Sequence, residues 1–182
     1  MVPVSLSGLS GLPTREEAAP YYFKYIDRIT NPDVVHVLDA QLPATLDYLR
    51  TFSEEASLHR YEAGKWSVRE VLGHVNDCER LFLSRAFWFA RGFSSGLPSF
   101  DQNVCASAAQ ADAAAWADHV EDFRIVRLGT LSFFRTLPKD AWTRSGVASD
   151  NPFTVRALAY LAAGHLEHHV EILRERYREA FR

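Results

Sequence analysis

The sequence predicts an all-α protein built as a four-helix bundle in a single domain. Four long segments carry apolar residues at spacings of three and four, the period of an amphipathic helix. Stretches containing Gly, Pro, Ser and Asn separate these segments, and no strand-like alternation of useful length occurs. A chain of 182 residues, 47% of them apolar and 24% charged, is long enough to bury one full core.

The four predicted helices span about residues 32–57, 67–91, 112–137 and 154–181. Pro43 lies inside the first and should kink or break it, because proline lacks an amide hydrogen and its ring clashes with the preceding turn. The second begins with the letters SVRE, a capping box in which Ser67 and Glu70 each bond the other's backbone. Trp66, just before this cap, is interpreted as a hydrophobic staple.

The segments outside the helices carry three further predictions. Residues 1–20 lack the basic start and continuous apolar run of a secretory signal, so we interpret them as a flexible lead and expect the domain over residues 21–182. The letters YYFKYI, residues 21–26, are too aromatic for a free tail and predict a short N-terminal helix or arm packed on the bundle. The letters SSGLPSFDQN, residues 94–103, predict a loop across one mouth of the bundle.

Charge and hydropathy exclude two classes of partner. A net charge of −3 without a basic run argues against a nucleic-acid surface, because phosphate neutralisation needs clustered Lys and Arg. No run approaches the roughly 18 uncharged apolar residues of a membrane span. The two cysteines, Cys78 and Cys105, form no disulfide framework, which agrees with a reducing compartment. We therefore expect a soluble, cytoplasmic protein with no nucleic-acid or membrane partner.

The letters GHLEHHV, residues 164–170, place three histidines close together on the fourth helix. A rotation of about 100° per residue puts His165 and His169 inside the apolar stripe and His168 at its edge. Two imidazoles four residues apart on a helix can both reach one ion. The pair is a weak signal by itself, because buried histidines are often hydrogen-bonded core residues.

His74 shifts the balance toward a metal site, because it lies on the apolar stripe of the second predicted helix. Three buried imidazoles without partners would be costly. An HxxxH pair that faces one further histidine across a bundle instead supplies the three protein ligands of an open catalytic site. A bound ion could then lower the pKa of a water ligand or stabilise a thiolate.

Other polar residues on these faces have two readings each. Asp77, one turn from His74, is the candidate catalytic residue, able to orient a ligand imidazole or accept a proton; otherwise it is a solvated or salt-bridged edge carboxylate. Cys78 could complete a closed four-ligand site, or be a buried thiol without a role. The interior arginines either pair with acidic residues between helices or hold a substrate carboxylate; they are Arg85, Arg127 and Arg176. The remaining histidines are interpreted as structural: His36, His59 and His119.

The letters KWSVREVLGHVNDCERLFLSRAFWFARG and, much later, LAAGHLEHHVEILRERY resemble the DinB-like, YfiT-like superfamily of four-helix metalloproteins. That family opens its second helix with a Trp-Ser-x-x-Glu-like cap leading to one metal histidine, and closes with an HxxxH pair. The resemblance covers residues 21–177. It implies an up-down-down-up bundle, frequent homodimers and a divalent ion, commonly Zn²⁺ or Ni²⁺, held by His74, His165 and His169.

The resemblance narrows the function without fixing the substrate. Family members with assigned activity are S-transferases that use thiols such as bacillithiol or mycothiol, or a related isomerase. Our first hypothesis is a metal-dependent enzyme whose substrate lies beside the ion, under the loop around residues 98–103. A thiolate nucleophile fits slightly better than water, because Asp77 is the only nearby base candidate. The alternatives are a metal-dependent hydrolase and a non-catalytic metal-binding stress-response protein whose ion stabilises the fold.

A further apolar face of the fourth predicted helix indicates self-association. It is formed by Leu166, Val170, Leu173 and Tyr177. Together with four broad apolar stripes, this is more apolar surface than one bundle interior readily uses. The sequence therefore predicts a homodimer with the metal inside each bundle, because both histidine motifs lie on the central stripes of one chain.

Overall fold

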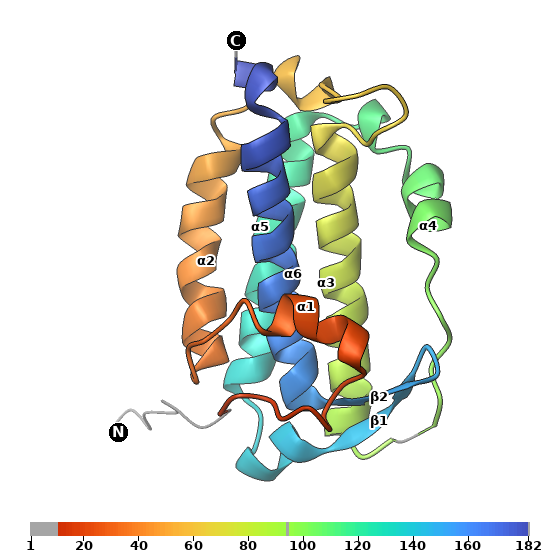
Figure 1. Ribbon diagram of the computed structural model, residues 1–182. Coiled ribbons are helices and arrows are strands. Elements are labelled where there is room, and N and C mark those ends of the chain that lie inside the picture. The colour runs from red at the N-terminus through yellow and green to blue at the C-terminus, as the bar shows by residue number, and fades with distance from the viewer. Residues whose placement is uncertain (1–10, 94, 182) are drawn as a thin grey trace.

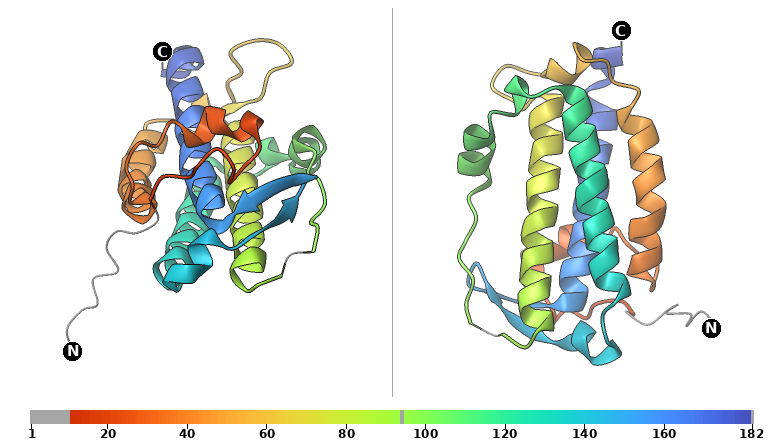
Figure 2. Two further views of the ribbon diagram at one scale, coloured as in Figure 1. Left: turned by 60° about the horizontal axis from the view of Figure 1, so that its bottom comes forward. Right: turned by 180° about the vertical axis from the view of Figure 1, so that it is seen from behind.

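The computed structural model describes residues 11–93 and 95–181, whose four long helices lie side by side as a bundle (Figure 1). They are α2 (Val34–Leu49), α3 (Val68–Ala90), α5 (Trp116–Arg135) and α6 (Val155–Arg176). Helices α2 and α6 run in one direction, and α3 and α5 run in the other (Figures 1 and 2). The predicted all-α, up-down-down-up bundle is therefore confirmed.

Shorter elements connect the long helices and flank them. They are η1 (Pro20–Tyr22), α1 (Phe23–Ile26), η2 (Ala56–Leu58), α4 (Gln102–Ala109), η3 (Ala111–Ala113), η4 (Lys139–Thr143), β1 (Ser145–Ala148), β2 (Asn151–Thr154) and η5 (Arg178–Phe181). The short α1 crosses α6 (Figure 1), which confirms the predicted N-terminal helix packed on the bundle. Helix α4 lies outside the bundle, beside α3 (Figure 2).

The helices begin and end where local or tertiary caps are available. The capping box of α3 is present, with the backbone N–H of Ser67 donating to Glu70 Oε2 at 2.8 Å and that of Glu70 donating to Ser67 Oγ at 3.1 Å. Helix α5 begins later than predicted, because the backbone N–H of Trp116 donates to a carboxylate oxygen of Glu54 from the α2–α3 connection, 2.9 Å away. Such a cap from elsewhere in the chain has no local sequence signal.

Of the two predicted effects of Pro43, a kink or a break, the break does not occur in α2. The helix continues through it, and Pro43 is exposed. A backbone carbonyl that loses its hydrogen bond on the solvated side of a helix can bond to water instead. The helix ends earlier than predicted, at Leu49, and the chain forms η2 before α3 begins.

A short two-stranded antiparallel hairpin follows α5 and is a minor addition to the helices that the sequence pattern did not predict. Strands β1 and β2 pair from Ser145 opposite Thr154 to Ala148 opposite Asn151. Their connecting residues, Ser149 and Asp150, have φ values of 51° and 59°, as tight hairpin turns require. Strands of four residues are too short to show a periodic alternation, which explains why the sequence pattern did not reveal them.

The described part of the predicted flexible lead packs against this hairpin. Ala18 forms a β-bridge with Phe153, and the backbone N–H of Thr154 donates to the Glu17 carbonyl at 3.0 Å. The buried Glu17 side chain accepts a hydrogen bond from Arg156 Nε at 2.9 Å. The lead therefore differs from the expectation at Glu17 and Ala18, whereas its residues 1–10 lie outside the described residues.

The face of α6 that suggested a dimer is covered within the chain. The exposed fractions of its residues are 2% for Leu166, 9% for Val170, 2% for Leu173 and 1% for Tyr177. All four belong to the buried cluster shared with α2, α3 and α5. This face therefore offers no surface to a second copy.

Among the described residues, no helix has the length and apolar character needed to cross a bilayer.

The core consists of two buried clusters, and the histidine of α3 lies where they meet. Val71 and Val75 belong to the cluster near the start of α3, whereas Cys78 and Phe82 belong to the cluster that continues toward its end. His74 lies just before Val75 and four residues before Cys78 along the helix, and it is 5% exposed. A polar side chain at this depth needs a partner.

Candidate metal centre

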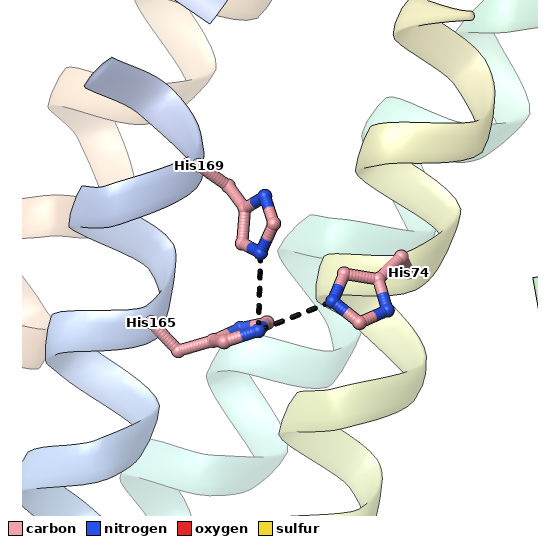
Figure 3. A group of neighbouring side chains, drawn as sticks. All are labelled: His74, His165 and His169. Atoms are coloured by element: carbon pink, nitrogen blue, oxygen red, sulfur yellow. Dashed lines mark hydrogen bonds between the residues drawn. The ribbon is translucent and has the colours of Figure 1, made fainter. Parts of the chain in front are cut away.

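Three histidines from two neighbouring helices converge inside the bundle. Helix α3 carries His74, and α6 carries His165 and His169 on successive turns, so the three rings face one another across the α3–α6 contact (Figure 3). His165 Nε2 lies 3.2 Å from His74 Nε2 and 3.2 Å from His169 Nε2. One ligand atom from each residue lies within 4.8 Å of the others.

The protein interior keeps these imidazoles neutral. Burial lowers the pKa of His74 to about 4, and burial together with the neighbouring His74 and His168 lowers that of His169 to about 3. Burial and the proximity of His169 likewise hold the pKa of His165 well below its ordinary value. Rings that are neutral at pH 7 keep the nitrogen lone pair that a metal ion requires.

The spacing fits a metal ion better than a hydrogen-bonded group of side chains. A ring nitrogen carries either one hydrogen or one lone pair, so His165 Nε2 can satisfy only one of its two 3.2 Å contacts well. Two nitrogens bound about 2.0–2.1 Å from one tetrahedral ion stand roughly 3.3 Å apart. The donor set therefore suits a divalent ion with three protein ligands and an open position.

Beside the group lies a cavity of about 260 Å³, here called the histidine pocket, bordered by His74 and His165. Other residues that line it include Tyr22, Tyr25, Phe82, Arg85, Phe100 and Gln102. Phe100 and Gln102 come from the segment predicted to lie across the bundle mouth. His169 borders a separate cavity of about 240 Å³, which Arg176 also lines.

Comparison with known proteins assigns the chain to a family and finds a solved structure with a similar fold. The sequence matches the family model described as the DinB superfamily over residues 38–173. The chain belongs to the DinB superfamily. Its fold is similar to that of YfiT from Bacillus subtilis, with 17% sequence identity, a TM-score of 0.66 and coverage of 90% of this chain and 93% of that one. YfiT is described as a probable metal-dependent hydrolase with an unusual four-helix bundle topology. A search of the curated proteins gave no match.

In this DinB-superfamily chain, the candidate base Asp77 is not brought to the histidines. Its Oδ2 accepts from Cys105 Sγ of α4 at 3.4 Å, and its Oδ1 lies 3.7 Å from Arg80 Nη1. Asp77 does not line the histidine pocket. The edge-carboxylate reading describes these contacts, because Asp77 is turned by about 60° from His74 around α3 and its carboxylate contacts Cys105 of α4.

Cys78 lies beside the histidines but outside the group of ligand atoms. Its Sγ is 3.6 Å from His74 Nδ1 and 3.7 Å from His74 Nε2, so the thiol lies against the ring rather than at the point where the nitrogens converge. Burial raises the pKa of Cys78 to about 12. The structure thus shows a buried thiol beside one candidate ligand.

The three interior arginines of the sequence prediction have different surroundings. Arg127 donates from Nε and Nη2 to the two carboxylate oxygens of Glu79, at 2.7 and 2.8 Å. Arg176 is exposed and donates to the Tyr61 hydroxyl at 3.2 Å. Arg85 is 4% exposed and lines the histidine pocket. The position of each arginine around its helix had predicted an interior side chain in all three cases.

The other histidines stay outside the group. His168 lies at the flank of the stripe, with its ring 5.2 Å from that of Tyr25. His119 Nε2 lies 2.8 Å from the carbonyl oxygen of Ala111. His36 is exposed, and the ring of His59 is 6.3 Å from that of Tyr177. None of them belongs to the group of three in the described chain.

Sequence reasoning did not connect two aromatic residues, Tyr25 and Trp66, with the candidate ligands. The ring of Tyr25 lies 5.3 Å from that of His165, and the ring of Trp66 lies 4.9 Å from that of His74. Gly164 makes the first contact possible, because a Cβ there would lie only 2.1 Å from the carbonyl oxygen of Tyr25. A glycine inside an apolar helix, directly before a candidate ligand, was the signal that could have revealed it.

Proposed function

We propose that this protein binds one divalent ion, Zn²⁺ or Ni²⁺, through His74, His165 and His169 and acts as a metal-dependent enzyme on small molecules. The observation that carries the proposal is the convergence of three neutral imidazoles beside the histidine pocket. Three protein ligands leave a position for a substrate atom. Membership of the DinB superfamily supports the same reading.

Within this class, the residues around the histidines favour S-transfer, in which a low-molecular-weight thiol is joined through its sulfur to an electrophile. When bound, a divalent ion stabilises a thiolate or lowers the pKa of water. An ionised thiol needs no general base, and no Asp or Glu is among the described residues that line the pocket. The thiol sulfur forms a bond to the electrophilic carbon, the leaving group departs with its electron pair, and the thiol proton goes to solvent.

The chain's own residues orient the ligands and limit access of water. Tyr25 and Trp66 pack against His165 and His74 and restrict how these rings can rotate. Phe82, whose ring lies 5.6 Å from that of His165, and Phe100 give the pocket apolar walls. Restricted solvent access strengthens electrostatic interactions between a bound substrate and the site.

Hydrolysis is the second candidate, favoured by the description of YfiT as a probable metal-dependent hydrolase. In that case water replaces the thiol as nucleophile, with the same three ligands. A third reading, a metal-binding protein without catalysis, predicts that metal removal unfolds the chain. An enzyme with an open site should instead lose activity before it unfolds.

The test compares the two reactions on one preparation. Protein depleted with a chelator and reloaded with Zn²⁺ or Ni²⁺ is assayed with monochlorobimane and cysteine, glutathione, bacillithiol or mycothiol, and separately with para-nitrophenyl acetate without a thiol. We expect metal-dependent thiol alkylation that is lost in His74→Ala and retained in His168→Ala. Ester hydrolysis without alkylation would replace S-transfer by hydrolysis. Unfolding on metal removal, with neither activity, would support the non-catalytic reading.

A further inference from the structure

One buried arginine lacks a counter-ion among the described residues. The described chain buries three arginines, Arg69, Arg85 and Arg127, each exposed by 4% or less. Arg127 binds both carboxylate oxygens of Glu79, and Arg69 forms an ion pair with Glu54. Arg85 forms no ion pair with any described residue. A buried guanidinium without a carboxylate is destabilising, because its lost hydration is not replaced by an opposite charge.

The hydrogen bonds of Arg85 leave much of the guanidinium unused. Both bonds come from Nη2, one to the Pro98 carbonyl at 3.0 Å and one to Ser149 Oγ at 2.8 Å. Nε is buried without a partner among the described residues. Burial lowers the pKa of Arg85, and the groups that oppose this shift are Tyr22 and Cys78, neither of them a carboxylate.

Arg85 and the metal ligand His74 line the same cavity. Both side chains come from α3, and the cavity is the histidine pocket of about 260 Å³. Their positions on α3 are about three turns apart, or roughly 16 Å along the helix axis. Long side chains on a helix tend to lean toward the helix N-terminus, which is the direction of His74 from Arg85 along α3. The residues that line this pocket include the aromatic Tyr22, Phe82 and Phe100.

We propose that Arg85 binds the carboxylate of a small-molecule ligand in the histidine pocket, so that the substrate is an organic acid with an apolar body between its carboxylate and its reacting atom. The free edge of the guanidinium supplies charge-assisted hydrogen bonds to the carboxylate. The aromatic walls contact the apolar body, and the reacting atom lies at the histidines. The assignment of the reacting end rests on the proposed function, whereas carboxylate binding at Arg85 does not.

Calorimetric titration of metal-depleted and metal-loaded protein with phenylacetate and hexanoate tests this proposal. The neutral controls are phenylacetamide and hexanamide, which keep the shape and lose the charge. We expect both protein forms to bind the acids and to bind the amides at least about tenfold more weakly, because a charged hydrogen bond is lost. Acid binding that requires the metal would place the carboxylate on the ion and overturn the proposal.

Three variants locate the anion. Arg85→Met should weaken phenylacetate binding about tenfold or more, and Arg85→Lys should retain part of the affinity because it keeps the charge. Arg176→Gln is the matched control, because Arg176 lines the separate cavity beside His169. The Arg176→Gln variant should bind phenylacetate with the same affinity as the unmodified protein. Unchanged binding in a folded Arg85→Met variant would overturn the proposal.

A measurement on the unmodified protein guards against misfolding of the variants. Phenylacetate should shift the assigned Arg85 Nε–H resonance in a nitrogen-proton NMR titration, and phenylacetamide should not. An unchanged resonance at saturation would overturn the proposal. If the acids bind to metal-depleted protein while all thiol and ester assays fail, the proposed function fails and the Arg85 site stands.

Discussion

The carbonyl of Tyr25 rests against Gly164, where a Cβ would lie 2.1 Å from the oxygen. Short α1 can therefore cross α6 closely enough for the Tyr25 ring to pack on His165, one residue along. The contact links a helix of the N-terminal segment to a candidate metal ligand. It makes the position of α1 part of the site.

Gly164→Ala should destabilise the protein and disturb the site. The added methyl group forces α1 away from α6, at a cost of about 1–3 kcal/mol in the free energy of unfolding. Gly129→Ala is the matched control, because Gly129 lies in α5 and a Cβ added there would meet nothing within 4 Å. Urea denaturation should show Gly129→Ala neutral or stabilised, since alanine favours a helix. Equal effects of the two substitutions would contradict the Tyr25 contact.

His74→Ala should sharply lower the content of divalent metal, because His74 is the one proposed ligand that α3 supplies. His168→Ala should leave the metal in place, since the His168 ring lies beside Tyr25 and outside the group of ligand atoms. Elemental analysis of the purified variants measures both effects. Full occupancy in His74→Ala, or an empty site in His168→Ala, would reject the assignment of the three ligands.

Acid should destabilise the metal-depleted protein. The pKa of His74 is lowered from 6.5 to about 4 in the folded state, so the unfolded chain takes up its proton at the higher pH. Stability present above pH 6.5 is then lost as the pH falls toward about 4, by about 1.4 kcal/mol per pH unit for each such group. Urea denaturation measures the free energy of unfolding at each pH in this range. Its dependence on pH should be shallower for His74→Leu than for the unmodified protein, because leucine cannot titrate. Identical slopes would count against the burial effect.

Removing the partner of the fully buried Arg127 should cost stability without affecting the metal. Glu79→Ala leaves a buried guanidinium without its two-point carboxylate partner, and we expect a loss of about 3–5 kcal/mol. Glu121→Gln is the control, because its pair with Arg124 is on the surface and should contribute little. Urea denaturation measures the loss of stability, and elemental analysis measures the metal content, which should not change. A Glu79→Ala variant as stable as Glu121→Gln would contradict the buried pair.

Local patterns in the sequence were sufficient to predict the presence of the four long helices and the candidate ligands. The Ser67 and Glu70 cap is a local pattern, and the spacing of His165 and His169 places both on one side of any helix that contains them. His74 could be assigned to the interior because the apolar period of its helix extends over many turns. These features depend on neighbours along the chain, which is why helical periodicity reveals them.

The partner of each interior side chain, in contrast, was set by the tertiary structure. Helix periodicity predicted an interior side chain for both Arg85 and Arg127. Only Arg127 pairs with Glu79, which lies on another helix, whereas Arg85 lines the histidine pocket. Asp77 lies one turn from His74 but faces Cys105 on α4. The apolar face that suggested a dimer is covered by the chain's own helices. Periodicity shows that a residue points inward, whereas its partner depends on how helices distant in sequence are packed together.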